Sequence, residues 1–341
     1  MRPPEHWHLP RQRRRPVRLL LVLALLAVVV GVVGSLLVRP RLSGSDAEAP
    51  SASVEGAAGP DCAPPDQAPA FGSEVPGASD RLWFAGEMSP PKITGRTGAA
   101  LELPCGALLY ANNAHQRLAP ASLTKIATAL VAVERAELSE IVTVEVNSAL
   151  LSASSGSSVM GLKPGQQLSL RDLLYGLLLP SGNDAGIAIA EHLADSVPAF
   201  AKLMNRKVDD LGLVNTRFAN PHGLDDLIHY TTAYDIAVLG QELMAQPVLA
   251  DMVATQAYQP AWDGPPVWNG NRLLYEYEGA LGVKTGYTAA AGQTIVAAAE
   301  RDGRRLIVSV LGAWDRYSDA IALFEWAFAN TEPACEGTGQ T

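Results

Sequence analysis

The chain has 341 residues, of which 48% are hydrophobic, which is enough for one large domain or two ordinary ones. Residues 1–41 hold eight of the 26 Lys and Arg residues and one acid, so the remainder carries 18 bases against 34 acids, a net charge of −16. This acidic balance argues against nucleic acid as a partner.

The N-terminus predicts a membrane anchor. Six arginines lie within the first 18 residues and precede an uncharged run, Leu19–Val38, whose 20 residues are about the length that spans a hydrocarbon core. By the positive-inside rule the short basic arm lies in the cytoplasm and the rest of the chain outside. A cleaved signal peptide is the competing interpretation, but signal h-regions are shorter and this run ends in Val-Arg-Pro-Arg. Twin-arginine export is a weaker alternative.

The segment after the anchor is rich in Ala, Pro, Ser, Gly and acidic residues, and it predicts an extended or disordered linker. We therefore expect five parts, which are a cytoplasmic arm at 1–18, an anchor at 19–38, a linker at 39–80, a globular domain at 81–332 and a tail at 333–341.

The globular domain opens with a predicted hairpin over 99–103 and 107–110, where apolar residues alternate. A helix is expected to begin near Pro120, a residue suited to a first helical turn. Further helices are predicted over four segments, which are 170–178, 183–194, 198–211 and 234–244.

The last part of the domain predicts strands and one helix. Short β-like runs cover 282–288, 294–299 and 306–311, with the hairpin signal Asp302-Gly303 between the last two, and an amphipathic helix covers 318–328. Strands at both ends of the domain and helices between them predict an α/β (α+β) fold, in which an antiparallel sheet is built from both ends and carries a helical insertion.

The chain has three cysteines, Cys62, Cys105 and Cys335. A Cys62–Cys335 pair would join the two ends of the domain, because chain termini often lie close together. The sequence does not fix the connectivity, one cysteine remains in any pairing, and Cys105 has no assigned role. No CxxC, His/Cys cluster or HExxH spacing predicts a metal, and no motif calls for a cofactor.

Three short motifs carry the chemistry. In the first, Ser122-Leu-Thr-Lys125, the serine and the lysine share one helix face. A serine hydroxyl needs a base to become a nucleophile, and a lysine can act as that base only if burial and nearby positive charge lower its pKa. Lys284 could supply that charge.

The other two motifs are Ser181-Gly-Asn183, after an apolar helix, and Lys284-Thr285-Gly286, in a strand-like run. Ser181 could relay a proton and Asn183 could hydrogen-bond a substrate amide, although Ser and Asn also cap helices. Lys284 and Thr285 suit a carboxylate, and Gly286 would let a peptide backbone approach. Each motif alone is a weak signal, but their order and context together predict an acyl-transfer site.

These segments resemble the serine D-alanyl-D-alanine carboxypeptidases, the low-molecular-weight penicillin-binding proteins. The resemblance lies in Pro120-Ala-Ser-Leu-Thr-Lys-Ile126, Leu179-Pro-Ser-Gly-Asn-Asp-Ala185, Asn220-Pro-His-Gly-Leu224, His229-Tyr-Thr-Thr-Ala233 and Gly282-Val-Lys-Thr-Gly-Tyr-Thr288, within about residues 98–328. It implies a serine β-lactamase/transpeptidase-like fold, with a sheet flanked by helices and a helical lobe.

The resemblance also implies the reaction. Ser122 attacks the carbonyl of the penultimate D-alanine of the peptidoglycan stem peptide with Lys125 as base, and Ser181 helps to protonate the leaving D-alanine. The backbone N–H groups of Ser122 and Tyr287 form the oxyanion hole. Lys284 and Thr285 hold the carboxylate, water hydrolyses the acyl-enzyme, and β-lactam antibiotics would inhibit covalently.

Several alternatives stay open. The same acyl-enzyme could serve a transpeptidase or an endopeptidase. A β-lactamase is disfavoured, because no Glu-x-x-Leu-Asn stretch lies between the second and third motifs. A β-lactam sensor is disfavoured because about 18 cytoplasmic residues are too few for an effector domain, and a silent binding module would be expected to lose Ser122 or Lys125.

Overall fold

The computed structural model describes residues 89–335, which all fall in one compact unit spanning Val75–Thr341. The predicted arm, anchor and linker, together with Cys62, lie outside the described residues. Within the described part of the chain no single helix has the length and apolar composition to cross a membrane. Only α7 (Ala233–Ala245) and α8 (Pro247–Ala254) together would meet that criterion, and they are bent by 104°.

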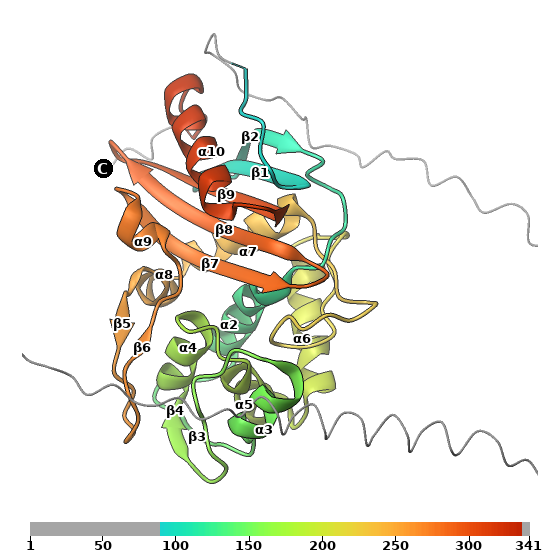
Figure 1. Cartoon of the computed structure of the whole chain (residues 1–341), viewed down its shortest axis with the longest axis vertical. Coiled ribbons are helices and arrows are strands. Elements are labelled where there is room, and N and C mark those ends of the chain that lie inside the picture. The colour runs from blue at the N-terminus through green and yellow to red at the C-terminus, as the bar shows by residue number, and fades with distance from the viewer. Residues whose placement is uncertain (1–88, 336–341) are drawn as a thin grey trace, which may run out of the picture. The chain divides into compact units, whose positions relative to one another are not determined.

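The centre of the domain is a five-stranded antiparallel sheet in the order β2-β1-β9-β8-β7 (Figure 1). Its strands are β1 (Thr97–Leu103), β2 (Ala107–Asn112), β7 (Ala280–Thr288), β8 (Gly292–Arg301) and β9 (Arg304–Ala313). The two N-terminal strands therefore join three C-terminal strands, as the sequence predicts. The hairpin signal is also confirmed, because Asp302 and Gly303 both have positive φ (53° and 78°) between β8 and β9.

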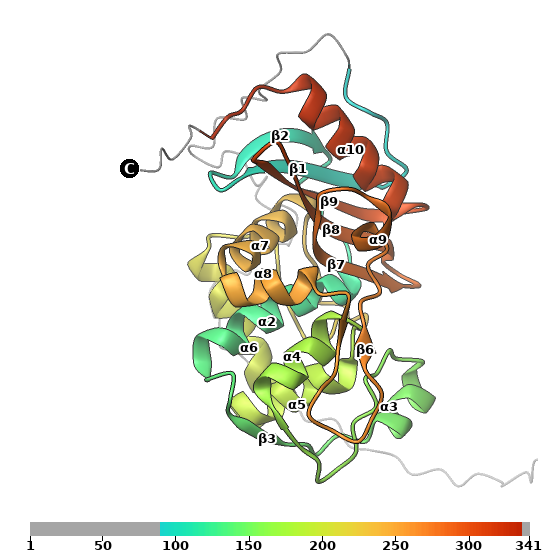
Figure 2. The same ribbon diagram turned by 90° about the vertical axis from the view of Figure 1, so that its left-hand side faces the viewer.

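Both faces of this sheet are covered. Helix α10 (Arg316–Asn330) packs on one face, and α7 covers the other, so the sheet separates two apolar cores (Figure 2). Every residue of β1 is consequently buried, including Glu102. The alternation seen in the sequence locates this strand but does not mark a solvent-exposed face.

The helical lobe is inserted between β2 and β7 (Figure 1). It begins with the short 3₁₀ turn η1 (Ala121–Leu123), whose first residue is one position after the predicted start at Pro120. The turn continues into α2 (Thr124–Arg135). Other helices are α3 (Ser148–Ser155), α4 (Leu170–Leu178), α5 (Asn183–Ala194), α6 (Val197–Asp210) and α9 (Leu273–Glu276). Two small hairpins complete it, β3 (Ile141–Thr143) with β4 (Gln167–Ser169), and β5 (Ala257–Tyr258) with β6 (Val267–Trp268).

Local sequence explains why the long helices begin where they do. Ser169 and Asp172 form a reciprocal capping box at α4, and Ser196 caps α6, which has a proline in its first turn. Asp315 accepts hydrogen bonds from the N–H groups of Tyr317 and Ser318 at the start of α10. The predicted helices over 170–178, 183–194, 198–211, 234–244 and 318–328 are confirmed within two residues at each end. Helices α3, α8 and α9 and strands β3–β6 were not predicted.

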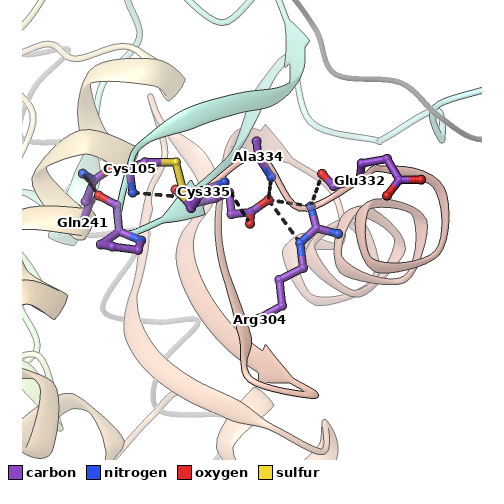
Figure 3. The surroundings of a disulfide bond; sticks show 8 residues. Cys105, Gln241, Arg304, Glu332, Ala334 and Cys335 are labelled. Carbon is purple, nitrogen blue, oxygen red and sulfur yellow. Dashed lines mark hydrogen bonds and ion pairs between the residues drawn. A yellow bond between two sulfur atoms is a disulfide. The ribbon is translucent and has the colours of Figure 1, made fainter. Parts of the chain in front are cut away.

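The proposed Cys62–Cys335 pair is wrong, because Cys335 is disulfide-bonded to Cys105. Cys105 lies in the β1–β2 turn, and the segment after α10 returns beside it (Figure 3). The disulfide therefore holds the end of the described chain against the first hairpin, and it supplies the role that the sequence left unassigned for Cys105.

Candidate active site

A pocket of about 550 Å³ lies where β7, the edge strand of the sheet, faces the helical lobe. All three sequence motifs contribute to it. Its walls include Ser122, Ser155, Gly156, Ser157, Ser158, Ser181, Asn183, His222, Gly223, Lys284, Thr285, Gly286, Tyr287, Thr288 and Arg316. Residues separated by up to 194 positions thus meet in one cavity, and every predicted site residue except the fully buried Lys125 lines it directly.

Ser122 and Lys125 are arranged for proton transfer. Ser122 sits in η1, ahead of α2, and Lys125 Nζ lies 3.0 Å from its Oγ. The same nitrogen donates to the Asn183 Oδ1 at 2.7 Å and to the His222 carbonyl at 2.7 Å. The amine is therefore held by two carbonyl oxygens on one side and by the serine on the other.

The electrostatics disfavour a positive charge on Lys125. This side chain is fully buried, and burial, reinforced by the positive charge of Lys284, holds its pKa well below the usual value of 10.5. The nearby Asp184 opposes this effect. The predicted influence of Lys284 is confirmed, but burial is the larger cause.

The turn that carries Ser122 is tightly enclosed. Ala121 has a left-handed backbone (φ 51°), and a Cβ at Gly223 would collide with the Ala121 carbonyl oxygen. On the other side, a Cβ at Gly286 would lie 2.8 Å from the Ser122 nitrogen. Glycine is needed at both positions because two backbone segments approach the nucleophile closely.

The middle motif lies at the junction of α4 and α5. Ser181 has φ 65°, and its buried Oγ has no hydrogen-bond partner within the described residues. Asn183 begins α5, and besides accepting from Lys125 it donates through its Nδ2 to Ser157 Oγ at 2.9 Å. Within the described residues the Ser181 hydroxyl thus has no hydrogen-bond partner, while the Asn183 side-chain amide is held on both sides.

The third motif forms a cationic end of the pocket. Lys284 Nζ donates to the Thr285 carbonyl at 2.9 Å, and burial together with the charge of Arg316 lowers the pKa of Lys284 to about 7. Arg316, at the start of α10, donates to the carbonyl oxygens of Gly286 and, at 3.4 Å, Thr294. Such a pair of cations suits a carboxylate.

Sequence reasoning missed Arg316 and the wall formed by Ser155–Ser158. Arg316 belongs to none of the three motifs, and its only sequence signal is a cation at the start of a helix, where cations are disfavoured by the dipole. The serine-rich wall follows α3, which was itself not predicted.

The two histidines that match the family pattern lie close to Ser122 but serve as packing and hydrogen-bonding residues. Burial, the largest cause in each case, lowers the pKa of His222 to about 3 and that of His229 to about 4. Both are therefore neutral near pH 7. His222 contributes its carbonyl to Lys125, and His229 hydrogen-bonds Thr124.

Among residues 89–335, no group of three or more His, Cys, Asp or Glu side chains is placed to hold a metal ion. The groups that the structure does bring together are the Ser122 and Ser181 hydroxyls, the buried Lys125 amine beside Ser122, and the cations Lys284 and Arg316.

Comparison with known proteins places this arrangement in a family. The family model described as D-alanyl-D-alanine carboxypeptidase, peptidase S11, matches residues 85–315. The D-alanyl-D-alanine carboxypeptidase DacF of Bacillus subtilis is 36% identical over 244 residues, which cover 70% of this chain and 63% of that protein. DacB2 of Mycobacterium tuberculosis is 35% identical over 264 residues, covering 74% of this chain and 89% of the relative. The match thus spans less than two thirds of DacF but most of DacB2.

Solved structures agree with the sequence comparison. The DD-transpeptidase of Streptomyces K15 superposes with a TM-score of 0.68 at 31% identity, over 71% of this chain and all of that one. The antiparallel sheet with a helical lobe is therefore the fold of the DD-peptidases, as the resemblance implies. The family model matches most of the chain, and the relatives and the shared fold agree with it. This chain therefore belongs to the D-alanyl-D-alanine carboxypeptidase family, peptidase S11.

Proposed function

We propose that the chain is a serine-type D-Ala-D-Ala carboxypeptidase that removes the terminal D-alanine from the peptidoglycan pentapeptide. The observation that carries this proposal is the hydrogen bonding of Lys125. A neutral amine has two N–H donors and one lone pair, and the two carbonyl oxygens of Asn183 and His222 can only accept. Both N–H groups are thereby used, so the lone pair faces Ser122 Oγ at 3.0 Å.

Acylation follows from this geometry. Lys125 accepts the Ser122 proton while Oγ attacks the carbonyl carbon of the penultimate D-alanine. The developing oxyanion would be stabilised by the N–H groups of Ser122 and Tyr287. Tyr287 directly follows Gly286, whose backbone approaches the Ser122 nitrogen closely. The unpartnered Ser181 hydroxyl can pass the proton to the leaving amine.

The cationic end of the pocket supports a substrate that ends in a carboxylate. Lys284, the Thr285 hydroxyl and Arg316 would bind the terminal D-alanine, while Asn183 is placed to bond the substrate amide. A bound carboxylate would favour the charged form of Lys284 and offset part of the cost of burying it. Water then hydrolyses the acyl-enzyme, and β-lactams, which carry a similar carboxylate and a reactive amide, would acylate Ser122.

A DD-transpeptidase is the second candidate function, favoured by the likeness to the Streptomyces K15 enzyme. It would use the same acyl-enzyme and differ only in the acceptor, an amine in place of water. An endopeptidase of cross-links and a β-lactamase rank below it.

We also propose that the domain is extracytoplasmic and held by the apolar N-terminal run. The Cys105–Cys335 disulfide supports this location, because disulfides persist mainly outside the cytoplasm. Recovery of the full chain in the salt-washed membrane fraction of its host, and release by a truncation at residue 42, would support the anchor. Recovery of a processed form in the medium would contradict it.

Mass spectrometry of a pentapeptide ending in D-Ala-D-Ala tests the function. The wild-type ectodomain should release one alanine, and Ser122→Ala should release at least about a thousandfold less, as expected when a nucleophile is removed. An amine acceptor such as glycine, added to the same reaction, would reveal transpeptidation as a product with a new amide. Release of no alanine and transfer to no acceptor by folded wild-type protein would rule out both candidates.

A further inference from the structure

Beneath the nucleophile lies a buried hydrogen-bonded chain that the proposed reaction does not use. His229 is 3% exposed and Thr124 is fully buried. The His229 Nε2 lies 2.7 Å from the Thr124 Oγ1, and Thr124 Oγ1 lies 2.8 Å from the Ala121 carbonyl oxygen. The chain thus joins the loop before α7 to the turn that carries Ser122.

The direction of the chain follows from its far end. The backbone N–H of Ala219 donates to the His229 Nδ1 at 3.0 Å, so this nitrogen is an acceptor and carries no proton. In the neutral ring the proton is then on Nε2, which donates to Thr124 Oγ1. The threonine hydroxyl uses its own proton to donate to Ala121 O, which also receives the Thr124 backbone N–H.

The final acceptor has a special position. The carbonyl of Ala121 and the N–H of Ser122 belong to one peptide unit, and this N–H is the proposed oxyanion-hole donor. Because the peptide is planar and conjugated, a hydrogen bond that fixes its oxygen fixes its N–H and makes it a better donor. The same unit is enclosed by Gly223 and Gly286, so it can adopt few other orientations.

We propose that His229 and Thr124 are positioning residues that orient and polarise the Ser122 N–H of the oxyanion hole. Four hydrogen bonds then run in one direction, from Ala219 N–H through His229, Thr124 and the Ala121 peptide to the carbonyl oxygen of the substrate. This inference rests on the proposed acyl-transfer function and adds a group of residues outside the pocket that acts on the transition state.

The test measures the kinetics of acylation by a fluorescent penicillin at several penicillin concentrations. These kinetics give a dissociation constant for the reversible complex and a rate constant for acylation. Thr124→Val preserves the shape of the side chain and removes the hydroxyl. It should lower the acylation rate constant by about 10- to 100-fold, which is less than the loss expected when an oxyanion-hole donor is deleted, and change the dissociation constant by less than about threefold. Thr124→Ser restores the hydroxyl and should return the rate to within about fivefold of wild type.

Variants of His229 give a second, independent test of the proposal. His229→Gln can place an amide N–H near the position of Nε2, whereas His229→Leu offers no donor. We expect the glutamine variant to acylate at least about fivefold faster than the leucine variant. The carbonyl stretching band of the acyl-enzyme adds a spectroscopic readout, because a weaker oxyanion hole moves it to higher wavenumber in Thr124→Val.

Thr128→Val is the matched control. Thr128 is also fully buried on α2, and its Oγ1 donates to the Pro221 carbonyl at 2.7 Å rather than to the Ala121 peptide. This variant should lose similar stability and keep an acylation rate within about threefold of wild type. Equal losses of rate in Thr124→Val and Thr128→Val, with unchanged carbonyl bands, would overturn the proposal, as would a folded Thr124→Val variant with the wild-type rate.

Penicillin acylation also separates this inference from the proposed function. It requires Ser122 and the oxyanion hole but no release of D-alanine. A wild-type protein that acylates normally and leaves the pentapeptide intact would contradict the carboxypeptidase, while the comparison of Thr124 variants would still decide the role of the chain.

Discussion

At the scale of single residues, the site depends on two buried lysines. A positive charge on either one lowers the stability of the folded domain. Lys125 is fully buried and Lys284 is 3% exposed, and the positive charge of Lys284 disfavours a second charge on Lys125. Burial acts against protonation of both lysines, and the charge of Arg316 acts further against protonation of Lys284. This arrangement suits Lys125 to act as a base. It also suits Lys284 to bind a carboxylate, whose negative charge would favour the charged form of the lysine.

A change of stability with pH should report this arrangement. An unfolded lysine keeps its proton up to about pH 10.5, whereas folded Lys284 releases it near pH 7. Between these values the unfolded chain binds more protons, so stability rises with pH, by up to about 1.4 kcal/mol per pH unit for this one group. Denaturant unfolding of the ectodomain from pH 7 to 9.5 should show the rise, and Lys284→Met should reduce its slope. Equal slopes in the two proteins would contradict the lowered pKa.

At the scale of elements, Asp184 connects the second motif to the serine-rich wall of the pocket. Its carboxylate is fully buried in the first turn of α5. Within 3.1 Å it accepts hydrogen bonds from the backbone N–H groups of Met160, Gly161 and Leu162 and from the Ser148 hydroxyl. The neighbouring Asn183 lines the pocket, so the two adjacent residues join the Asn183 amide to the loop after α3.

Asp184→Asn should therefore affect both stability and catalysis. The amide places an NH₂ group against donors, so we expect the free energy of unfolding to fall by about 3 kcal/mol and acylation to slow. Chemical denaturation and penicillin acylation measure the two effects.

Asp235→Asn is the control for this prediction. Asp235 is buried in α7 and accepts from Thr216 Oγ1 at 2.8 Å, away from the pocket wall. The Asp235→Asn variant should have a lower free energy of unfolding than the wild type and an unchanged acylation rate. If both variants slowed acylation equally, Asp184 would have no special link to the site.

At the scale of the whole molecule, the C-terminal segment is joined to the first hairpin by a disulfide and by hydrogen bonds to Glu102, which also pairs with Arg304 of β9. Arg304 Nη2 lies 2.6 Å from the Glu102 carboxylate, and the same carboxylate accepts from the N–H groups of Ala334 and Cys335 (Figure 3). Since Arg304 also donates to the Thr331 carbonyl at 2.8 Å, one guanidinium ties β9 to the segment after α10.

Cys335→Ser should destabilise the domain without disabling it. The disulfide closes a loop of 230 residues, so we expect a loss of about 2 to 5 kcal/mol in the free energy of unfolding. The disulfide lies by β1 and β2, and the sheet order places β7 at the opposite edge, so the acylation rate should stay within about twofold of wild type. Wild-type protein measured with a reductant is the matched comparison. An unchanged unfolding midpoint in both would show that the bond carries no stability.

Much of this organisation could be predicted because it is local. The three motifs, the helix starts at Ser169 and Ser196, and the Asp302-Gly303 turn each depend on residues within a few positions of one another. Glu102 shows the limit of such reasoning. Alternation predicts its strand but not its burial, which depends on Arg304, a partner 202 positions away.

The sequence by itself determined the family and predicted the nucleophile and its base, because a short motif at helical spacing already places a serine beside a lysine and the order of the motifs is specific. Only the tertiary structure decided how that lysine is buried beside the serine, which distant residues join the site and which cysteines pair. Lys125 Nζ is held 3.0 Å from Ser122 Oγ by two further hydrogen bonds, to Asn183 and to the carbonyl of His222, which lie 58 and 97 positions away. Burial, long-range charge and pairing across the chain are properties of packed neighbours, and packing brings together residues that no local pattern relates.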